Sequence, residues 1–152
     1  MPMKMTLVAA ITCLLISTSA LSQTGDPDRE TIDAAVAKID EYWSIGDMQS
    51  WVDMFAEDAS FVNSAMTEPA VGRDAISKLA SQWPEVENIR EWRVIEGNRM
   101  AIGWRERGRK KDGQMGGWYR GMSTFVFDSN GLIKTYEGMF NMQAIKAAYS
   151  DN

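Results

Sequence analysis

The sequence predicts an α+β fold in which three helices pack on a strongly bent antiparallel sheet. Two observations lead to this prediction. After residue 29, the first half of the chain places apolar residues at helical spacing, and the second half carries strand-like segments separated by turn signals. Helices followed by an antiparallel sheet are typical of α+β proteins, because the helices must cover one face of the sheet. If the sheet curls around them, the space between becomes a cone with one open end.

The start of the chain differs in character from the rest. Lys4 precedes an apolar stretch at 7–16, and mostly small residues follow it. This order is typical of a secretory signal peptide, and the stretch is well short of the roughly 20 residues that span a bilayer. We therefore expect a signal peptide at 1–22, a flexible tail at 23–29 and a single domain at 30–149. The expected location is periplasmic or secreted, with no membrane attachment after cleavage.

The helices are expected in the first half of the domain. A first helix is predicted at 30–45, where one apolar stripe contains Ile32, Val36, Ile39 and Trp43. Gly46 is placed to end this helix in a left-handed conformation, and Asp47 is placed to cap the next one. Further helices are predicted at 48–57 and 72–82.

The strands dominate the second half. A short strand is expected at 59–63, before the third helix. The longer strands are predicted at 90–95, 99–109, 115–127 and 132–141, separated by Gly97-Asn98, Asp112-Gly113 and Asn130-Gly131. Three consecutive hairpins of this kind make an antiparallel sheet. A short final helix is expected at 142–149.

Alternation along the strand at 99–109 indicates which face meets the core. Met100, Ile102 and Trp104 share one face, whereas arginines occupy much of the other. The apolar face should face the helices. Glu106 continues that face, so the same pattern turns a carboxylate inward.

Composition narrows the chemistry. The chain has no histidine and a net charge of −5. Catalytic pairs that use an imidazole are excluded, and zinc and transition metals lose their commonest ligands, so we expect no metal and no cofactor. Acid–base chemistry would rest on Asp, Glu, Tyr, Lys or water. An acidic chain without a basic stripe is also a poor candidate for binding nucleic acid.

Several motifs resemble a known superfamily. Residues 42–47 and 51–59 resemble the opening of nuclear transport factor 2-like domains, 72–76 resembles the start of their third helix, and 124–133 resembles their last hairpin. The chain is thus similar to SnoaL-like domain proteins over nearly all of 30–141. The resemblance implies a cone-shaped fold. It implies no single reaction, because the superfamily holds isomerases, dehydratases, cyclases, hydrolases and non-catalytic binders.

The ketosteroid isomerases of this superfamily offer a specific comparison. The resemblance puts their first-helix tyrosine on Ile39, their general-base aspartate on Asn63 and their oxyanion-hole carboxylic acid on Ser123. Isoleucine offers no hydrogen bond, and asparagine cannot take up a proton at neutral pH. The resemblance therefore implies a ketosteroid isomerase-like fold without the catalytic residues.

Glu106 is the candidate catalytic residue. A carboxylate on the inner face is costly to bury, and such groups in clefts are candidates for general acids or bases. The alternative is that Glu106 lies near the strand end, reaches water and pairs with a basic neighbour. The candidate ligand-binding residues are Trp43, Asn63, Trp104, Tyr119, Ser123 and Tyr136. Together they would give an apolar cone a modest polar lining, as in many small-molecule sites.

Three classes of function remain open at this point. An enzyme would bind a small apolar or aromatic molecule and use Glu106 for isomerisation, dehydration or hydrolysis. A binding protein would use the same pocket without chemistry. A protein-interaction or dimerisation module would have its cone filled by Trp104 and Tyr119. A homodimer is expected through the outer sheet face, which carries Gly103, Arg105, Met122, Thr124, Val126, Glu137 and Met139.

Overall fold

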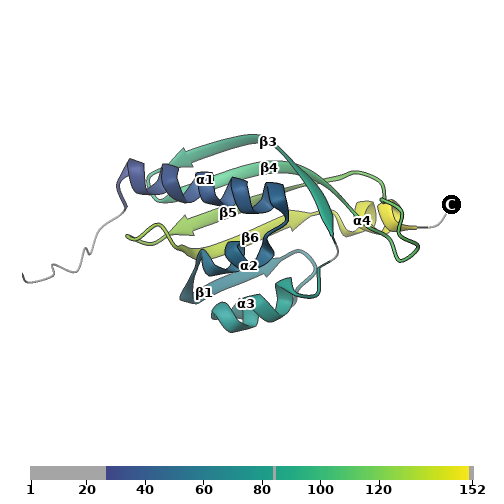
Figure 1. Cartoon of the computed structure of the whole chain (residues 1–152), viewed down its shortest axis with the longest axis horizontal. Coiled ribbons are helices and arrows are strands. Elements are labelled where there is room, and N and C mark those ends of the chain that lie inside the picture. Colours follow the sequence, from purple (N-terminus) through teal and green to yellow (C-terminus); the bar gives the residue numbers. More distant parts are fainter. Residues whose placement is uncertain (1–26, 84, 151–152) are drawn as a thin grey trace, which may run out of the picture.

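The computed structural model describes residues 27–83 and 85–150 (Figure 1). The predicted signal peptide at 1–22 lies outside these residues, as does most of the predicted tail at 23–29. The described helices are α1 (Arg29–Ile45), α2 (Met48–Asp53), α3 (Arg73–Ala80) and α4 (Met142–Tyr149). The described strands are β1 (Phe55–Asn63), β2 (Ala70–Val71), β3 (Val86–Glu96), β4 (Arg99–Gly108), β5 (Tyr119–Phe127) and β6 (Ile133–Phe140). Among the described helices, none has the length and hydropathy that crossing a bilayer requires.

The junction between α1 and α2 forms as its sequence predicts. Gly46 ends α1 with φ of 72°, in the left-handed region that glycine adopts without a steric penalty. The Asp47 carboxylate accepts a hydrogen bond from the Ser50 amide at 3.0 Å and so caps α2. Local backbone chemistry alone is enough to turn the chain between the two helices.

The predicted helix at 48–57 is wrong at its C-terminal end. α2 stops at Asp53, and Phe55 already begins β1. The Met54 carbonyl accepts a hydrogen bond from the Ile133 amide at 2.7 Å, and Phe55 pairs with Ile133. Trp51, Met54 and Phe55 are buried as expected, so the apolar pattern was correct. A strand nearly 80 residues later in the chain determines where the helix ends.

The sheet has six strands in the order β2-β1-β6-β5-β4-β3. The pairs β3–β4, β4–β5 and β5–β6 are antiparallel, which confirms the three predicted hairpins. β1 instead lies parallel to β6, so the sheet is mixed and not wholly antiparallel as expected. The short β2, for which no strand was predicted, pairs antiparallel with β1 at the edge.

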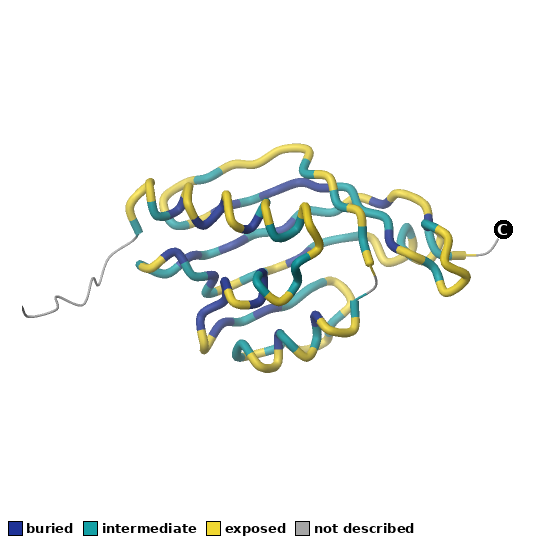
Figure 2. The backbone as a smooth tube through the Cα atoms, viewed as in Figure 1, coloured by how far each residue is buried: buried dark blue, intermediate teal, exposed yellow. Residues whose placement is uncertain are grey.

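The helices cover one face of the curved sheet. α1 and α2 lie in front of the strands, and α3 lies beside β1 (Figure 1). Ile32, Val36 and Ile39 of α1 are buried against the sheet. Figure 2 shows buried positions recurring along α1 and the central strands, whereas β3 is exposed over much of its length. α4 has the bounds that the sequence predicts and lies at the far end of the molecule (Figure 1).

Candidate ligand-binding cavity

A cavity of about 620 Å³ lies between the sheet, the C-terminal end of α1 and α4. Its wall includes all seven residues that the sequence singled out: Trp43, Asn63, Trp104, Glu106, Tyr119, Ser123 and Tyr136. Trp104 and Tyr119 are buried, but they lie on the wall and do not fill the space. The cone is therefore open in this structure.

Strand alternation turns these side chains toward the cavity. Ile102, Trp104 and Glu106 line it from β4, as the pattern of the strand predicts. From β5 and β6 the wall includes Tyr119, Ser123, Phe125, Tyr136 and Phe140. Phe127, two residues after Phe125, is buried in the core and is not part of the wall.

Gly121 explains how Trp104 fits without blocking the cone. The two residues lie opposite each other in the β4–β5 pair. A Cβ atom on Gly121 would lie 2.4 Å from two atoms of the Trp104 ring, closer than any side chain tolerates. The indole therefore lies across the glycine, against the sheet. A larger residue at this position would push the ring into the cavity.

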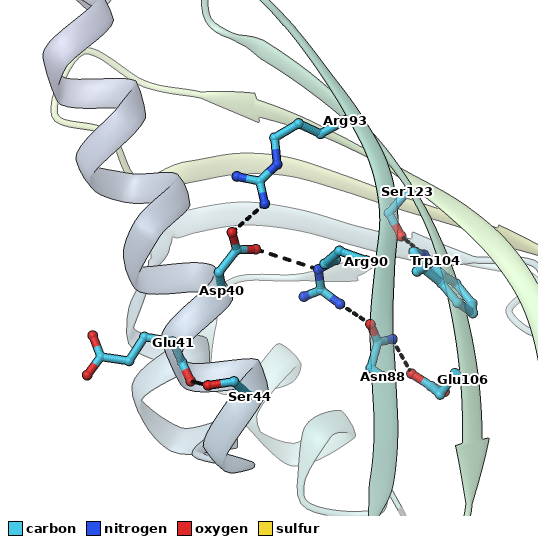
Figure 3. A network of polar contacts seen from close by, with 9 residues as sticks. All are labelled: Asp40, Glu41, Ser44, Asn88, Arg90, Arg93, Trp104, Glu106 and Ser123. Carbon is cyan, nitrogen blue, oxygen red and sulfur yellow. Dashed lines mark hydrogen bonds and ion pairs between the residues drawn. The ribbon is translucent and has the colours of Figure 1, made fainter.

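Glu106 is part of a polar chain on one wall (Figure 3). Its Oε2 accepts a hydrogen bond from the Asn88 amide at 2.8 Å, and its Oε1 accepts one from the Tyr119 hydroxyl. Arg90 donates to the Asn88 carbonyl oxygen, so the guanidinium lies one amide away from the carboxylate. The carboxylate is thus oriented by two neutral donors, neither of which is the basic neighbour considered as an alternative.

Arg90 connects this wall to α1. Its guanidinium lies over the Trp43 ring, 5.2 Å from the centroid, and its Nε lies 3.7 Å from an Asp40 carboxylate oxygen (Figure 3). Burial lowers the pKa of Arg90, and the nearby Asp40 charge acts in the opposite direction. The charged group is held by a carboxylate, an aromatic face and an amide.

Burial and the Glu106 charge both raise the pKa of Tyr119. The phenol therefore stays protonated at neutral pH and can serve as a hydrogen-bond donor to Glu106. An ordered donor on a carboxylate in a cavity is an arrangement suited to acid–base chemistry, because it fixes the direction in which the carboxylate can exchange a proton.

A second polar group lies deeper. The Trp104 Nε1 donates to Ser123 Oγ at 2.9 Å, and Ser123 Oγ lies 2.9 Å from the Tyr136 hydroxyl. Burial raises the pKa of Tyr136 to about 12. Ser123 is 1% exposed, so its hydroxyl is satisfied within the protein. Asn63 is engaged elsewhere, because its Oδ1 accepts from the Ala65 amide at 2.9 Å and closes the turn after β1.

Aromatic rings form a large part of the remaining wall. Trp43 stacks on Trp83 with 6.3 Å between ring centroids, and Phe61 stacks on Tyr136 at 4.5 Å. Tyr149 of α4 packs against Tyr119 at 6.3 Å. Such a surface suits a flat, apolar molecule. Within the described residues, no cluster of three or more Asp, Glu, Cys or His side chains could hold a metal ion.

Among the cavity residues that sequence reasoning missed, four contribute polar groups or large rings: Trp83, Asn88, Arg90 and Tyr149. Asn88 and Arg90 alternate along β3 opposite Glu106 and Trp104. Alternation along the predicted strand at 90–95 could not have identified them, because the register shifts between Arg90 and Trp92 and only this shift turns both side chains to the inner face. Trp83 and Tyr149 lie outside the long strands, where alternation gives no signal.

Comparison with known proteins agrees with this architecture. The profile of the SnoaL-like domain matches residues 36–136. Among curated proteins, none matches this chain. An NTF2-like protein of unknown function from Burkholderia pseudomallei is 14% identical, with a TM-score of 0.70, over 80% of this chain and 98% of that chain.

Two further solved structures share the fold. Delta 5-3-ketosteroid isomerase from Mycobacterium sp. is 20% identical, with a TM-score of 0.63, over 75% of this chain and 95% of that chain. A Mycobacterium tuberculosis protein in complex with estradiol-17beta-hemisuccinate is 14% identical, with a TM-score of 0.64, over 74% of this chain and 95% of that chain. The predicted α+β cone is confirmed, and the chain belongs to the SnoaL-like domain family, with a nuclear transport factor 2-like fold.

Proposed function

We propose that this protein binds a small, largely aromatic molecule in its cone-shaped cavity. The observation that carries the proposal is a cavity of about 620 Å³ with nine aromatic side chains in its wall and two hydrogen-bonded polar groups. Small-molecule sites typically have volumes of roughly 300–1,000 Å³ and this mixture of surfaces. The structural neighbour in complex with a steroid derivative supports the same kind of ligand.

Trp104→Ala tests the binding site. Loss of the indole removes part of the cavity wall, so affinity for an aromatic ligand should fall by more than the loss of stability explains. Ligand found by native mass spectrometry, or an aromatic probe followed by tryptophan fluorescence, provides the measurement. Trp118→Ala is the matched control, because Trp118 is 40% exposed and packs against Arg105 and Arg107. Equal effects of both substitutions would contradict the proposal.

Acid–base catalysis by Glu106 is the second candidate function. The supporting observation is that both carboxylate oxygens are oriented, one by Asn88 and one by Tyr119, on the wall of the cavity. A carboxylate positioned in this way can take a proton from one carbon or oxygen of a ligand and return it to another. The reaction classes that fit are isomerisation, dehydration and hydrolysis.

Glu106→Gln separates an enzyme from a binder. The substitution keeps size and much of the hydrogen bonding but removes proton exchange, so turnover should fall roughly 10²- to 10⁴-fold while binding is largely kept. Glu87→Gln is the matched control on β3, because Glu87 is half exposed and pairs with Arg107. Unchanged turnover of a verified substrate in Glu106→Gln would leave the cavity with a binding role alone.

Two further features of the proposal concern where and in what form the protein acts. The signal-like pattern at 1–22 supports a periplasmic or secreted protein, and loss of about 22 residues in its intact mass would test this.

The apolar side chains of Met122, Val126 and Met139 on the outer sheet face support a homodimer. Light scattering that gives a monomer at tens of micromolar would contradict the dimer, because an interface of standard size holds at about that concentration.

A further inference from the structure

The hydrogen atoms of the deep polar group can be assigned one by one. The Trp104 indole nitrogen can only donate, so Ser123 Oγ is the acceptor of that bond. Ser123 and Tyr136 each carry one hydroxyl hydrogen, but the 2.9 Å contact between their oxygens uses only one of the two. The other hydrogen must point somewhere else. Its direction determines what the cavity offers to a ligand.

The burial of Ser123 determines which hydroxyl donates. Ser123 is 1% exposed, and the Tyr136 oxygen is the acceptor that lies within reach of its hydroxyl. If Tyr136 donated instead, the Ser123 hydrogen would be buried without a partner, which is more costly than leaving the hydrogen of a cavity-facing phenol for a ligand. The bonds therefore run from Trp104 to Ser123 and from Ser123 to Tyr136. They leave the Tyr136 hydrogen available to the cavity.

Two neighbouring rings hold the Tyr136 ring in place. It stacks on Phe61, with an interplanar angle of 4°, and meets Phe125 edge-on at 5.0 Å. Gly138 leaves room for the hydroxyl, since a Cβ atom there would lie 3.2 Å from the phenol oxygen. The pKa of about 12 keeps Tyr136 protonated at neutral pH. The donor is thus fixed before a ligand arrives.

The polar group around Glu106 presents the complementary chemistry. Each oxygen of Glu106 accepts one bond, from Asn88 or Tyr119, and a carboxylate can accept about four in all. Glu106 therefore retains capacity to accept a hydrogen bond from a ligand. Arg90, one amide away, offsets its charge within the same wall. A neutral ligand suits this wall, because the carboxylate and the guanidinium already offset each other.

We propose that Tyr136 is the hydrogen-bond donor for a carbonyl oxygen of the ligand, and that Glu106 accepts from a ligand hydroxyl. The ligand class is a neutral, hydroxylated aromatic ketone. This inference rests on the proposed function, because it concerns the same cavity. Ser123 is a positioning residue that orients the Tyr136 hydroxyl without touching the ligand.

Three naphthalene probes test the assignment. Naphthalene has no polar group, 2-acetylnaphthalene adds a carbonyl, and 1-(6-hydroxynaphthalen-2-yl)ethanone adds a carbonyl and a hydroxyl. Affinity is measured by tryptophan fluorescence, and the carbonyl stretching frequency of the bound ketones is measured by difference infrared spectroscopy. In the wild type, affinity should rise in that order, by roughly 2- to 12-fold for each hydrogen bond gained.

Tyr136→Phe keeps the ring and removes only the hydroxyl. Affinity for both ketones should fall by roughly 2- to 12-fold, while naphthalene binding stays unchanged. The carbonyl stretch should move to higher frequency, because the bond to oxygen is lost. Equal loss for all three probes, or an unchanged carbonyl stretch, would overturn the role of Tyr136 and leave the aromatic pocket intact. Failure of every probe to bind the wild type would overturn the proposed function together with this inference.

Ser123→Ala tests the direction of the bonds, because the two possible directions predict shifts of the carbonyl stretch that are opposite in sign. If Ser123 donates to Tyr136, its loss weakens Tyr136 as a donor, and the carbonyl stretch moves part of the way toward its value in Tyr136→Phe. If Tyr136 donates to Ser123, the substitution frees the phenol, so the carbonyl stretch falls and the ketones bind more tightly. The second result would overturn the assignment. Circular dichroism of each variant verifies that the fold is retained.

Discussion

The two ends of the cone fill the space between helices and sheet in different ways. The closed end is filled by fully buried side chains, among them Trp51, Phe55 and Ile133. The Trp51 ring packs against the Phe55 ring, and Phe55 pairs with Ile133 in the sheet. At the open end, Glu106 and Tyr136 sit on the wall of a cavity and bond to other side chains. The closed end gains stability from apolar burial, whereas the open end leaves apolar surface uncovered and holds its polar groups in fixed positions.

The tryptophans show the contrast within one residue type. Trp51 contacts Trp43, Phe55 and Phe61 and is 0% exposed. Trp104 has one ring edge on the cavity and uses its N–H to hold Ser123. A large side chain therefore serves packing at one end and shapes the site at the other. Trp51 packs behind the cavity wall, against Trp43, Phe61, Trp83 and Tyr136, so its loss should lower stability and also loosen that wall.

The largest effect is expected from Trp51→Ala. Removing this side chain leaves a void surrounded by rigid rings, so the free energy of unfolding should fall by about 3–5 kcal/mol. Urea denaturation followed by circular dichroism provides the measurement. A loss below about 1 kcal/mol would mean that the closed end repacks freely, which would break the contrast between the two ends.

Gly121→Ala should have a smaller effect on stability and a direct effect on the cavity. The added methyl group would meet the Trp104 ring at 2.4 Å and the Met139 carbonyl oxygen at 2.7 Å. We expect a destabilisation of about 1–3 kcal/mol from overpacking and weaker binding of the larger naphthalene probes, because the indole moves into the cavity. Urea denaturation and probe titration measure the two effects.

Gly117→Ala is the control for that substitution. Its methyl group would lie 3.4 Å from the Ala148 Cα, an ordinary contact. Stability should then change by less than about 1 kcal/mol, since a tolerated alanine also restricts the unfolded chain. If both glycine variants behaved alike, the fit of Trp104 against Gly121 would have no special role in forming the cavity.

A pH-dependent effect on stability is expected at alkaline pH. Burial raises the pKa of Tyr136 from 10.0 to about 12, so the folded state keeps a proton that the unfolded chain loses first. The stabilising contribution is complete below pH 10, declines as the pH rises and is lost above about 12. Tyr136→Phe should therefore lose less stability than the wild type across this window. Urea midpoints of both proteins, measured across this pH range, test the sign of the difference. Wild-type and Tyr136→Phe midpoints that fall in parallel with pH would contradict the prediction.

Local features of the sequence predicted much of the fold. The Gly46-Asp47 junction, the three hairpins and α4 depend on residues close together in the chain, and the structure confirms them. The alternation of Ile102 and Trp104 put Glu106 on the correct face for the same reason. The prediction was wrong where a distant partner decides, as at the end of α2 and in the parallel pairing of β1 with β6.

The sequence by itself determined the fold class, the helix junction and the inward face of β4, because these follow from backbone preferences and from the period of apolar residues. Only the tertiary structure decided that the cone is open and which groups share its wall. Trp104 lies flat because Gly121, on the neighbouring strand, leaves room for it, and Glu106 is oriented by Asn88 from another strand. Contacts of this kind depend on register and curvature across the sheet, which the local sequence pattern does not encode.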